Sequence, residues 1–367
     1  EFGFVKAYEW SPKSEKIIFL KFNETAVQTF SLHLLNGNLY PESKKFKYPK
    51  AGEENSKVSL HIVNINSNKT KTIELKNYEY ISSLKWTSKA NVFAVTTLNR
   101  KQNILKLYAI NCDDYSKKLL LTEKSETYID SENNTDLHFL KDNSFIMQNE
   151  KNGFNHLYHF KSNGILKQQI TKGNWEVTKF YGIDKKENKL YYQSTEDGSI
   201  NRTIYSISLN GKNKKRIGLA NGTSDAEFSY SKKYAIINHS DANTPLNYSL
   251  FNGKKIIKEI QNNKVLLEKL SPYKLPKKVF SILKTENGSF NMWMIKPSDF
   301  SAEKTYPLLM VQYSGPGSQT VTNRWNSYND FWYQLLAQNG YIVACIDGRG
   351  TGAKGSEFKK STYKNLG

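Results

Sequence analysis

A tyrosine at the edge of a glycine-rich turn is the residue whose setting most suggests chemistry. Tyr313 lies in "YPLLMVQYSGPGSQ" (306–319), where a stretch that predicts a buried strand meets the turn. Gly315 and Gly317 let the backbone approach a substrate carbonyl closely, and Pro316 stiffens the turn. A tyrosine hydroxyl held there is suited to donate a hydrogen bond to an oxyanion, worth roughly 2.7–4 kcal/mol in a dry site. From the spacing alone, a packed strand aromatic is the favoured interpretation of Tyr313 and the oxyanion donor is the alternative.

A second glycine-rich stretch, "DGRGTGAKG" at 347–355, raises the question of phosphate binding. Gly350, Gly352 and Gly355 have the G-x-G-x-x-G spacing of a dinucleotide-binding turn. That fingerprint also needs an acidic residue about 20 positions further on, past residue 367, and no Lys-Ser or Lys-Thr pair ends the stretch as in a phosphate loop. A tight structural loop at the carboxyl edge of a sheet fits these residues better than nucleotide binding, so we expect no cofactor.

The sequence holds no complete nucleophile or metal motif. No Gly-x-Ser-x-Gly occurs in the 367 residues, and the six histidines show no His-Glu-x-x-His or other metal-ligand spacing. The two cysteines are Cys112 and Cys345, and the apolar run "YIVACID" around Cys345 predicts a buried, inert thiol. We therefore expect no metal and assign no member of a catalytic triad within the chain.

The net charge of +19, from 53 Lys and Arg against 34 Asp and Glu, raises nucleic acid or an anionic membrane as partners. The lysines are scattered and mostly lie at turns, as in "NGKNKKRI", and no zinc knuckle, RNP-type aromatic run or helix-turn-helix pattern accompanies them. No apolar run approaches the ~18 residues of a membrane span. The charge thus predicts a solvated basic surface, with no nucleic-acid partner and no membrane span in this chain.

Short alternating strands, broken by Asn, Gly and Lys turns, extend to about residue 265. An aromatic or apolar residue, a lysine-rich turn and a hydrophobic strand recur as a unit, for example in "WTSKANVFAV" and "IDKKENKLYYQ". Anchored on Ile17, Val92, Phe145, Leu190 and Tyr234, the units lie 75, 53, 45 and 44 residues apart. The last two spacings match a four-stranded propeller blade of ~40–50 residues. The pattern predicts a partial all-β propeller of about five blades, with an irregular β-sandwich array as the alternative.

The first spacing exceeds a blade by about 30 residues, and this polar insertion at about 30–57 predicts a loop on one face of the repeat. Two prolines mark a change of composition at 267–278, which indicates a linker. A hairpin, a strand, a helix at 331–340 and a second apolar strand follow, as at the start of an α/β sheet domain. We therefore predict a propeller at 1–266 and the first part of an α/β domain at 279–367.

A propeller followed by an α/β domain with a Tyr-x-Gly-Pro loop resembles the prolyl oligopeptidase family of serine peptidases, and most of all its dipeptidyl peptidase IV branch. "AYEWSP", "EKNGFNHLYHF" and "TKGNWEV" resemble propeller strands of that branch. "YPLLMVQYSGPGSQ" and "IVACIDGRGTGAKG" resemble the opening of its hydrolase domain, and they are the most specific because several uncommon residues coincide in order. The resemblance covers almost the whole chain and implies an α/β-hydrolase fold for the second domain.

The resemblance also implies roles for individual residues. Tyr313 matches the oxyanion-hole tyrosine of the family. In the dipeptidyl peptidase branch, a glutamate pair on the propeller binds the free amino terminus of the substrate, and Glu1 in "EF" matches the last glutamate of that acidic run. The alternative for Glu1 is a terminal residue without a role. Arg349 matches a family position, and we interpret Arg349, Asp347 and the 315–317 turn as structural support for the active-site edge.

In this family the catalytic serine lies in a Gly-x-Ser-x-Gly elbow, followed by an aspartate and a histidine. All three are expected beyond Gly367, so we expect a fragment that is inactive alone. The implied substrates are peptides with a free N-terminus and proline or alanine second. A homodimer through the 30–57 arm and the hydrolase domain, and a periplasmic, cell-surface or secreted location, are also implied.

Two alternatives to a dipeptidyl peptidase remain open at this point. One is another peptidase of the same family, of the endopeptidase or acylaminoacyl type. The other is a propeller without catalysis that binds peptides or partner proteins.

Overall fold

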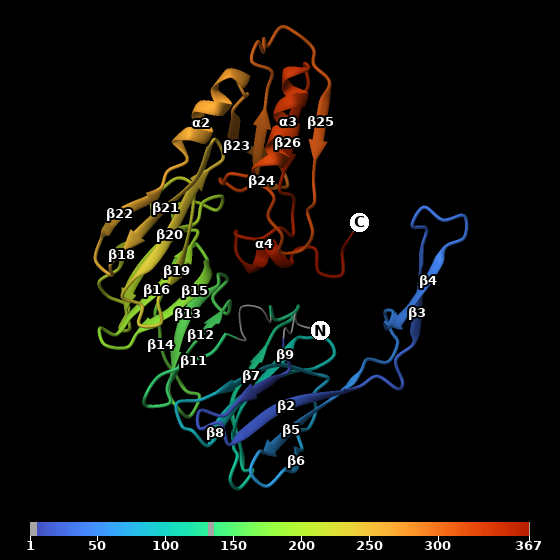
Figure 1. Ribbon diagram of the computed structural model, residues 1–367, viewed down its shortest axis with the longest axis vertical. Helices are drawn as coiled ribbons and strands as arrows, with labels where there is room; N and C mark the ends of the chain where they lie inside the picture. The colour runs from blue at the N-terminus through green and yellow to red at the C-terminus, as the bar shows by residue number, and fades with distance from the viewer. Residues whose placement is uncertain (1–5, 131–135, 367) are drawn as a thin grey trace. The chain divides into compact units, whose positions relative to one another are not determined.

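The computed structural model describes residues 6–130 and 136–366. The chain divides into two compact units, of which the first runs to Phe145 and includes Phe160–Ile165. The second unit comprises Ile146–His159 and Leu166 onward. Within the described residues, five four-stranded antiparallel sheets precede a mixed sheet with helices (Figure 1). This order confirms the predicted fold class of about five propeller blades followed by the start of an α/β domain.

The first two sheets have the orders β1-β2-β5-β6 and β10-β9-β8-β7. Alternating apolar residues place one face of each strand in the core, so that Ile18, Leu60 and Phe93 are fully buried in one cluster. The strands are β1 (Tyr8–Trp10), β2 (Lys16–Asn23), β5 (Lys57–Asn64), β6 (Lys69–Ile73), β7 (Tyr80–Trp86), β8 (Val92–Leu98), β9 (Ile104–Asn111) and β10 (Lys117–Lys124).

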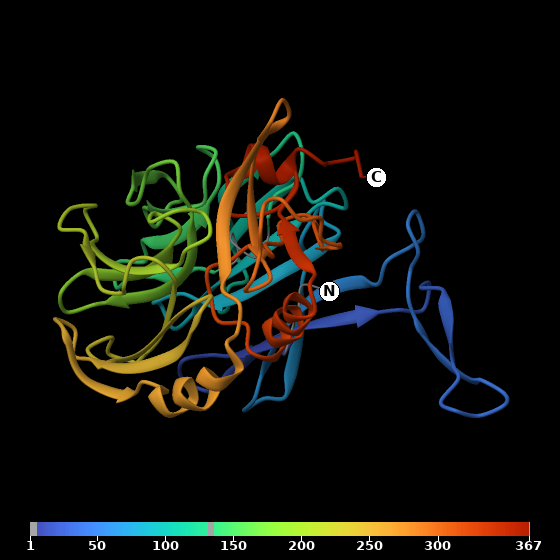
Figure 2. The same cartoon turned by 90° about the horizontal axis from the view of Figure 1, so that it is seen from above.

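The polar insertion between β2 and β5 forms a two-stranded antiparallel hairpin, β3 (Thr29–Leu34) and β4 (Glu42–Lys47). Figures 1 and 2 both show this hairpin extending away from the sheet that contains β2 and β5. The rings of Phe30, Phe46 and Tyr48 contact one another at centroid distances of 5.7–6.2 Å. At the tip, Leu39 and Tyr40 are 89% and 80% exposed, so the hairpin presents apolar side chains to solvent.

The next three sheets have the orders β11-β12-β13-β14, β15-β16-β17-β18 and β19-β20-β21-β22. Tyr191, Ile204 and Ile237 belong to a buried cluster shared by the last two of them. The strands are β11 (His138–Phe139), β12 (Phe145–Asn149), β13 (His156–Phe160), β14 (Leu166–Gln169), β15 (Val177–Asp184), β16 (Lys189–Ser194), β17 (Thr203–Ser208), β18 (Lys215–Arg216), β19 (Thr223–Phe228), β20 (Ala235–Asp241), β21 (Thr244–Phe251) and β22 (Ile256–Gln261).

A short helix, α2 (Lys264–Leu270), and a 3₁₀ turn at Ser271–Tyr273 come before the mixed sheet and overlap the stretch predicted as a linker. The mixed sheet has the order β23-β24-β26-β25, in which β25 and β26 are parallel and the other pairs are antiparallel. Its elements are β23 (Lys278–Thr285), β24 (Gly288–Ile295), β25 (Leu308–Val311), α3 (Tyr328–Gln338), β26 (Ile342–Ile346) and α4 (Ser356–Lys360).

Helix α3 covers the mixed sheet and closes a small apolar core. Ala337 of α3 lies in one buried cluster with Trp293 of β24 and with Val343 and Cys345 of β26. Cys345 is fully buried, as predicted, and burial raises the pKa of its thiol to about 12. The thiol is therefore protonated at neutral pH and unreactive.

A buried ion pair also joins α3 to β23. The ammonium of Lys278 lies 2.7 Å from each carboxylate oxygen of Asp330, and both side chains are nearly inaccessible. The same ammonium lies 4.6 Å from the ring centroid of Trp293. The pair and the ring fix the start of α3 against the first strand of the sheet.

The prediction of a buried strand before Tyr313 was wrong for the described residues. Leu308 and Met310 of β25 are 57% and 46% exposed. The reason is that β25 lies at the edge of the sheet and pairs only with β26 among the described strands. Within the described part of the chain, no helix has the length and apolar character needed to cross a membrane.

Candidate functional site

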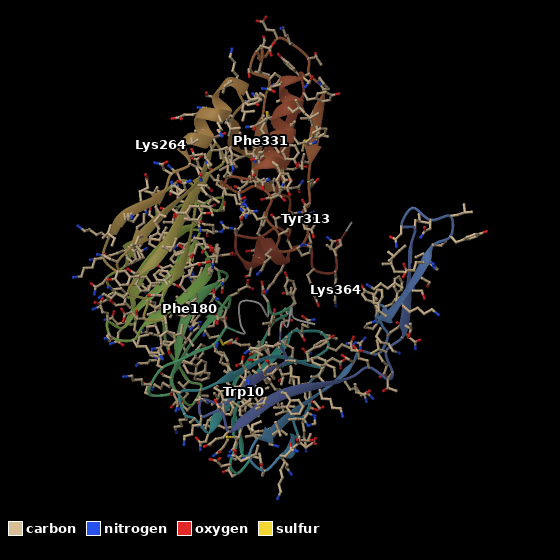
Figure 3. The ribbon with its side chains drawn as sticks, in the orientation of Figure 1. Trp10, Phe180, Lys264, Tyr313, Phe331 and Lys364 are labelled. Atoms are coloured by element: carbon tan, nitrogen blue, oxygen red, sulfur yellow. The ribbon has the colours of Figure 1, made fainter. Side chains whose placement is uncertain are left out.

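Tyr313 lies on the loop that follows β25 and is 76% exposed, so it is not a packed strand aromatic (Figure 3). Asp347 follows β26, and because β25 and β26 are parallel, both residues lie at the same carboxyl edge of the sheet. The ring of Tyr313 lies against Gly315, where an added Cβ would be only 2.7 Å from Cε1 of the ring. The glycine therefore makes room for the tyrosine ring in this position.

The glycine-proline stretch forms a tight turn. The backbone N–H and the hydroxyl of Ser318 both donate to the carbonyl of Gly315, at 2.9 and 2.6 Å. Gly317 has φ +74°, in the left-handed region that favours glycine. The turn at 315–318 is thus closed by its own hydrogen bonds.

The two glycine-rich loops are bonded to each other through their backbones. The N–H of Gly317 donates to the carbonyl of Gly350, and the N–H of Gly352 donates to the carbonyl of Ser318, each at 2.8 Å. A Cβ on Gly352 would lie 2.6 Å from the carbonyl oxygen of Gly317, so only glycine allows this approach. The bonds support the prediction of a structural loop, because a phosphate site would need these N–H groups to be available.

Asp347 supports the first loop from the end of β26. It is 2% exposed, and its two carboxylate oxygens accept hydrogen bonds from the backbone N–H groups of Thr320 and Val321, both at 2.9 Å. Burial raises the pKa of Asp347, while these two hydrogen bonds and Lys354 act in the opposite direction. The carboxylate therefore fixes the segment just after the turn that carries Tyr313.

Two predicted site residues remain, Arg349 and Glu1. Arg349 is exposed, and its guanidinium makes no hydrogen bond or ion pair with residues that the structure describes. Glu1, predicted to bind the substrate amine, lies outside the described residues. Over 6–130 and 136–366, no group of three or more His, Cys, Asp or Glu residues is arranged to hold a metal ion.

Two carboxylates of the second unit hold helix α4 and were missed by the sequence analysis. Glu150, after β12, pairs with the ammonium groups of Lys359 and Lys360. Glu176, before β15, accepts the N–H of Gly355 at 2.8 Å, and burial raises its pKa. Partners about 200 positions apart leave no signal in a single sequence, so only the fold brings these residues together.

An arginine on the same unit holds the far end of the first loop. Arg202, just before β17, donates to the side-chain oxygen of Gln319 and to the carbonyls of Ser199 and Asn201. Burial lowers its pKa to about 10. The amide of Gln319 donates back to the carbonyl of Ser199 at 2.9 Å. Blade residues therefore fix both loops at the edge where Tyr313 lies.

Comparisons with known proteins place this arrangement in a family. The sequence model of the dipeptidyl peptidase IV N-terminal region matches residues 1–246, and that of the prolyl oligopeptidase family matches residues 326–367. The dipeptidyl peptidase 4 of Trichophyton equinum is 31% identical over 390 residues, which cover 100% of this chain and 50% of that protein. For the dipeptidyl peptidase 4 of Arthroderma otae the identity is 31% over 395 residues, with the same coverage.

A solved structure is similar over the whole chain. The crystal structure of dipeptidyl peptidase 4 from Porphyromonas gingivalis aligns with a TM-score of 0.94 at 40% identity. The alignment covers 100% of this chain and 52% of that one. The chain thus spans about half the length of the relatives it matches.

Proposed function

The chain belongs to the prolyl oligopeptidase family, in its dipeptidyl peptidase IV branch, and from this premise we propose that it is part of a serine exopeptidase. The proposed reaction releases dipeptides from the N-terminus of peptides, preferentially with proline or alanine second. A serine outside these 367 residues attacks the peptide carbonyl, the C–N bond breaks, and the rest of the peptide leaves as an amine that takes up a proton. The dipeptide remains bound as an acyl-enzyme ester, which water then hydrolyses.

One observation carries this proposal: the exposed residue Tyr313 lies on a loop that is held both by the 350–352 loop and by Asp347. When the serine adds to the carbonyl, the carbonyl oxygen becomes negatively charged, and a fixed donor stabilises it more than it stabilises the substrate. The turn at 315–318 is fixed by the 350–352 loop and by Asp347, so the hydroxyl needs little reorganisation during the reaction. One such donor contributes roughly 2.7–4 kcal/mol to the transition state.

The test uses the full-length protein and a chromogenic dipeptide substrate such as glycyl-prolyl or alanyl-prolyl p-nitroanilide. We expect Tyr313→Phe to lower kcat by ~10²–10³-fold with little change in KM, because the hydroxyl acts on the oxyanion. Tyr328→Phe is the matched control, since Tyr328 is 75% exposed and lies at the start of α3. Equal turnover in the two variants would exclude the oxyanion role.

We further propose that Glu1 pairs with the free amino terminus of the substrate, because a desolvated ammonium needs a charged partner. The same peptide with an acetylated N-terminus lacks this charge and is expected not to react. Hydrolysis of the acetylated peptide would instead favour an endopeptidase or acylaminoacyl type. Peptide binding without any hydrolysis by the full-length protein would favour a propeller that only binds.

We also propose that the β3–β4 hairpin takes part in a homodimer together with the hydrolase domain. Its support is the exposed apolar tip at Leu39 and Tyr40. Aromatic and aliphatic side chains of this kind are costly to leave in water and are frequent at the centre of interfaces.

A further inference from the structure

A buried carboxylate in the loop after β12 is paired with two lysines of α4. The ammonium of Lys360 lies 2.9 Å from one oxygen of Glu150, and the ammonium of Lys359 contacts the other. The side chains of Glu150 and Lys359 are each only 7% exposed. At the first residue of α4, the N–H of Ser356 donates to the carbonyl of Gly153 at 2.7 Å, which brings the helix against the same loop.

Helix α4 is in turn connected to the turn that follows Tyr313. The carbonyl of Phe358 accepts the N–H of Gly350 at 3.1 Å, and the carbonyl of Gly350 accepts the N–H of Gly317 at 2.8 Å. The stem of Lys359 also lies beside this turn, with its Cδ 3.7 Å from the place that a Cβ on Gly317 would occupy. A shift of Lys359 therefore acts on the turn by two routes.

We propose that Glu150 is a positioning residue that acts through Lys359 to fix the 315–318 turn and, with it, the hydroxyl of Tyr313. Glu150 itself touches neither the turn nor the substrate. This inference rests on the proposed function, because it requires Tyr313 to face a reacting carbonyl. It adds to that function a propeller residue on which the oxyanion donor depends.

The physical reason is the narrow geometry of a buried ion pair. Such a pair adds little net stability compared with apolar residues of similar volume, because both charges lose their hydration. Its energy nevertheless rises steeply when the charged atoms separate in a medium of low dielectric constant, whereas an apolar contact tolerates sliding. The ion pair therefore adds little to the free energy of unfolding, but it fixes the position of α4.

The first test is steady-state kinetics of Glu150→Gln in the full-length protein with the dipeptide p-nitroanilide. The neutral amide loses the ion pairs of Glu150 with the ammonium groups of Lys359 and Lys360, so we expect α4 to relax by a fraction of an ångström. Since a 1 Å misplacement costs ~10²-fold, we expect kcat to fall about tenfold while KM stays within about twofold. If the variant only contained fewer folded molecules, the apparent kcat would also fall. The folded molecules would then bind a transition-state analogue, such as a prolyl boronic acid, with the wild-type affinity.

Two further variants make the comparison sharp. Glu196 lies after β16 and pairs with Lys214. It has no contact with α4 or with the two glycine-rich loops among the described residues, so Glu196→Gln should keep the wild-type kcat. The triple variant Glu150→Gln/Lys359→Met/Lys360→Met removes both ammonium groups together with the carboxylate, so kcat should recover to within about threefold of the wild type.

Hydrogen exchange of the N–H groups of Gly317 and Gly352 tests the coupling without any substrate. We expect both to exchange about tenfold faster in Glu150→Gln than in Glu196→Gln, because both donate between the loops. The positioning role would be overturned if these N–H groups exchanged equally fast in Glu150→Gln and Glu196→Gln. It would also be overturned if they exchanged faster in Glu150→Gln while kcat stayed unchanged. If the wild-type protein hydrolyses no dipeptide substrate, the proposed function fails, while the exchange data still decide whether Glu150 is coupled to the turn.

Discussion

Replacing Gly352 with alanine is expected to slow catalysis by forcing the two glycine-rich loops apart. The backbone of Gly352 lies outside the left-handed region, so alanine is not strained by its own conformation. Its Cβ would, however, lie 2.6 Å from the carbonyl oxygen and 3.3 Å from the carbonyl carbon of Gly317. Both are backbone atoms, so no side-chain rotation relieves the contact.

The magnitude follows from these distances. Cβ contacts below 3.0 Å are essentially never seen, so the loops must separate by at least about 0.4 Å. Because a 1 Å misplacement of a catalytic group costs ~10²-fold, a shift of this size lowers kcat roughly fivefold or more. This corresponds to about 1 kcal/mol in the activation barrier.

The assay is turnover of a glycyl-prolyl p-nitroanilide by the full-length protein, with kcat and KM determined separately. Gly348→Ala is the matched control, because it adds the same methyl group to the same loop. Its Cβ would meet only the side chains of Ser314 and Gln312, at the ordinary distances of 3.6 and 3.8 Å. We expect Gly348→Ala to keep the wild-type kcat. We expect Gly352→Ala to lower kcat roughly fivefold or more, with little change in KM.

One result would refute this reasoning. If Gly352→Ala and Gly348→Ala have the same kcat, and a crystal structure of Gly352→Ala shows the carbonyl of Gly317 displaced, the position of the turn does not control turnover. Thermal melting of both variants separates this outcome from a simple loss of folded protein.

Three further predictions concern the rest of the chain. Lys278→Met leaves Asp330 charged and buried, so the free energy of unfolding in guanidinium should fall by about 3–5 kcal/mol, and Lys278→Met/Asp330→Leu should recover most of it. Burial raises the pKa of Glu176 above its ordinary value of 4.5. Its contribution to the free energy of unfolding is therefore present at low pH and is lost as the pH rises through the pKa of the folded state. Glu176→Gln should remove this dependence of stability on pH and should melt at a higher temperature than the wild type near neutral pH. If the proposed homodimer forms, serine at both Leu39 and Tyr40 should weaken its association about tenfold or more in sedimentation, with kcat unchanged.

The repeated strands could be predicted from the sequence because their signal is local. In β2, the apolar run in "KIIFLKF" between two lysines predicts a strand, and Ile18 and Leu20, two positions apart, are buried in the core as the period of a strand requires. The hairpin predicted at the start of the second domain is formed by β23 and β24, and the pairing of Thr285 with Gly288 places its turn at residues 286–287. A period or a turn needs only neighbouring residues, so one sequence suffices.

The supports of the candidate site could not be predicted in this way. Glu150 meets Lys359 across 209 positions, and neither residue differs in its local sequence from many exposed lysines and glutamates of the chain. Asp347 was expected to support the active-site edge, but its bonds to Thr320 and Val321 depend on the parallel pairing of β25 and β26. The apolar composition of β25 predicted burial, whereas among the described strands β25 has a neighbour on one side only.

The electrostatics of these supports explains why carboxylates are tolerated beside a site proposed to bind an oxyanion. An unbalanced negative charge there would oppose the charge that develops on the substrate oxygen. Asp347 and Glu176 instead accept backbone N–H groups, and Glu150 faces two ammonium groups. Each carboxylate thus fixes a loop or helix while donors balance its charge. For the same reason, removing Lys359 alone should harm turnover more than removing Glu150, Lys359 and Lys360 together, because the single change leaves the buried carboxylate of Glu150 with one ammonium fewer beside the loops.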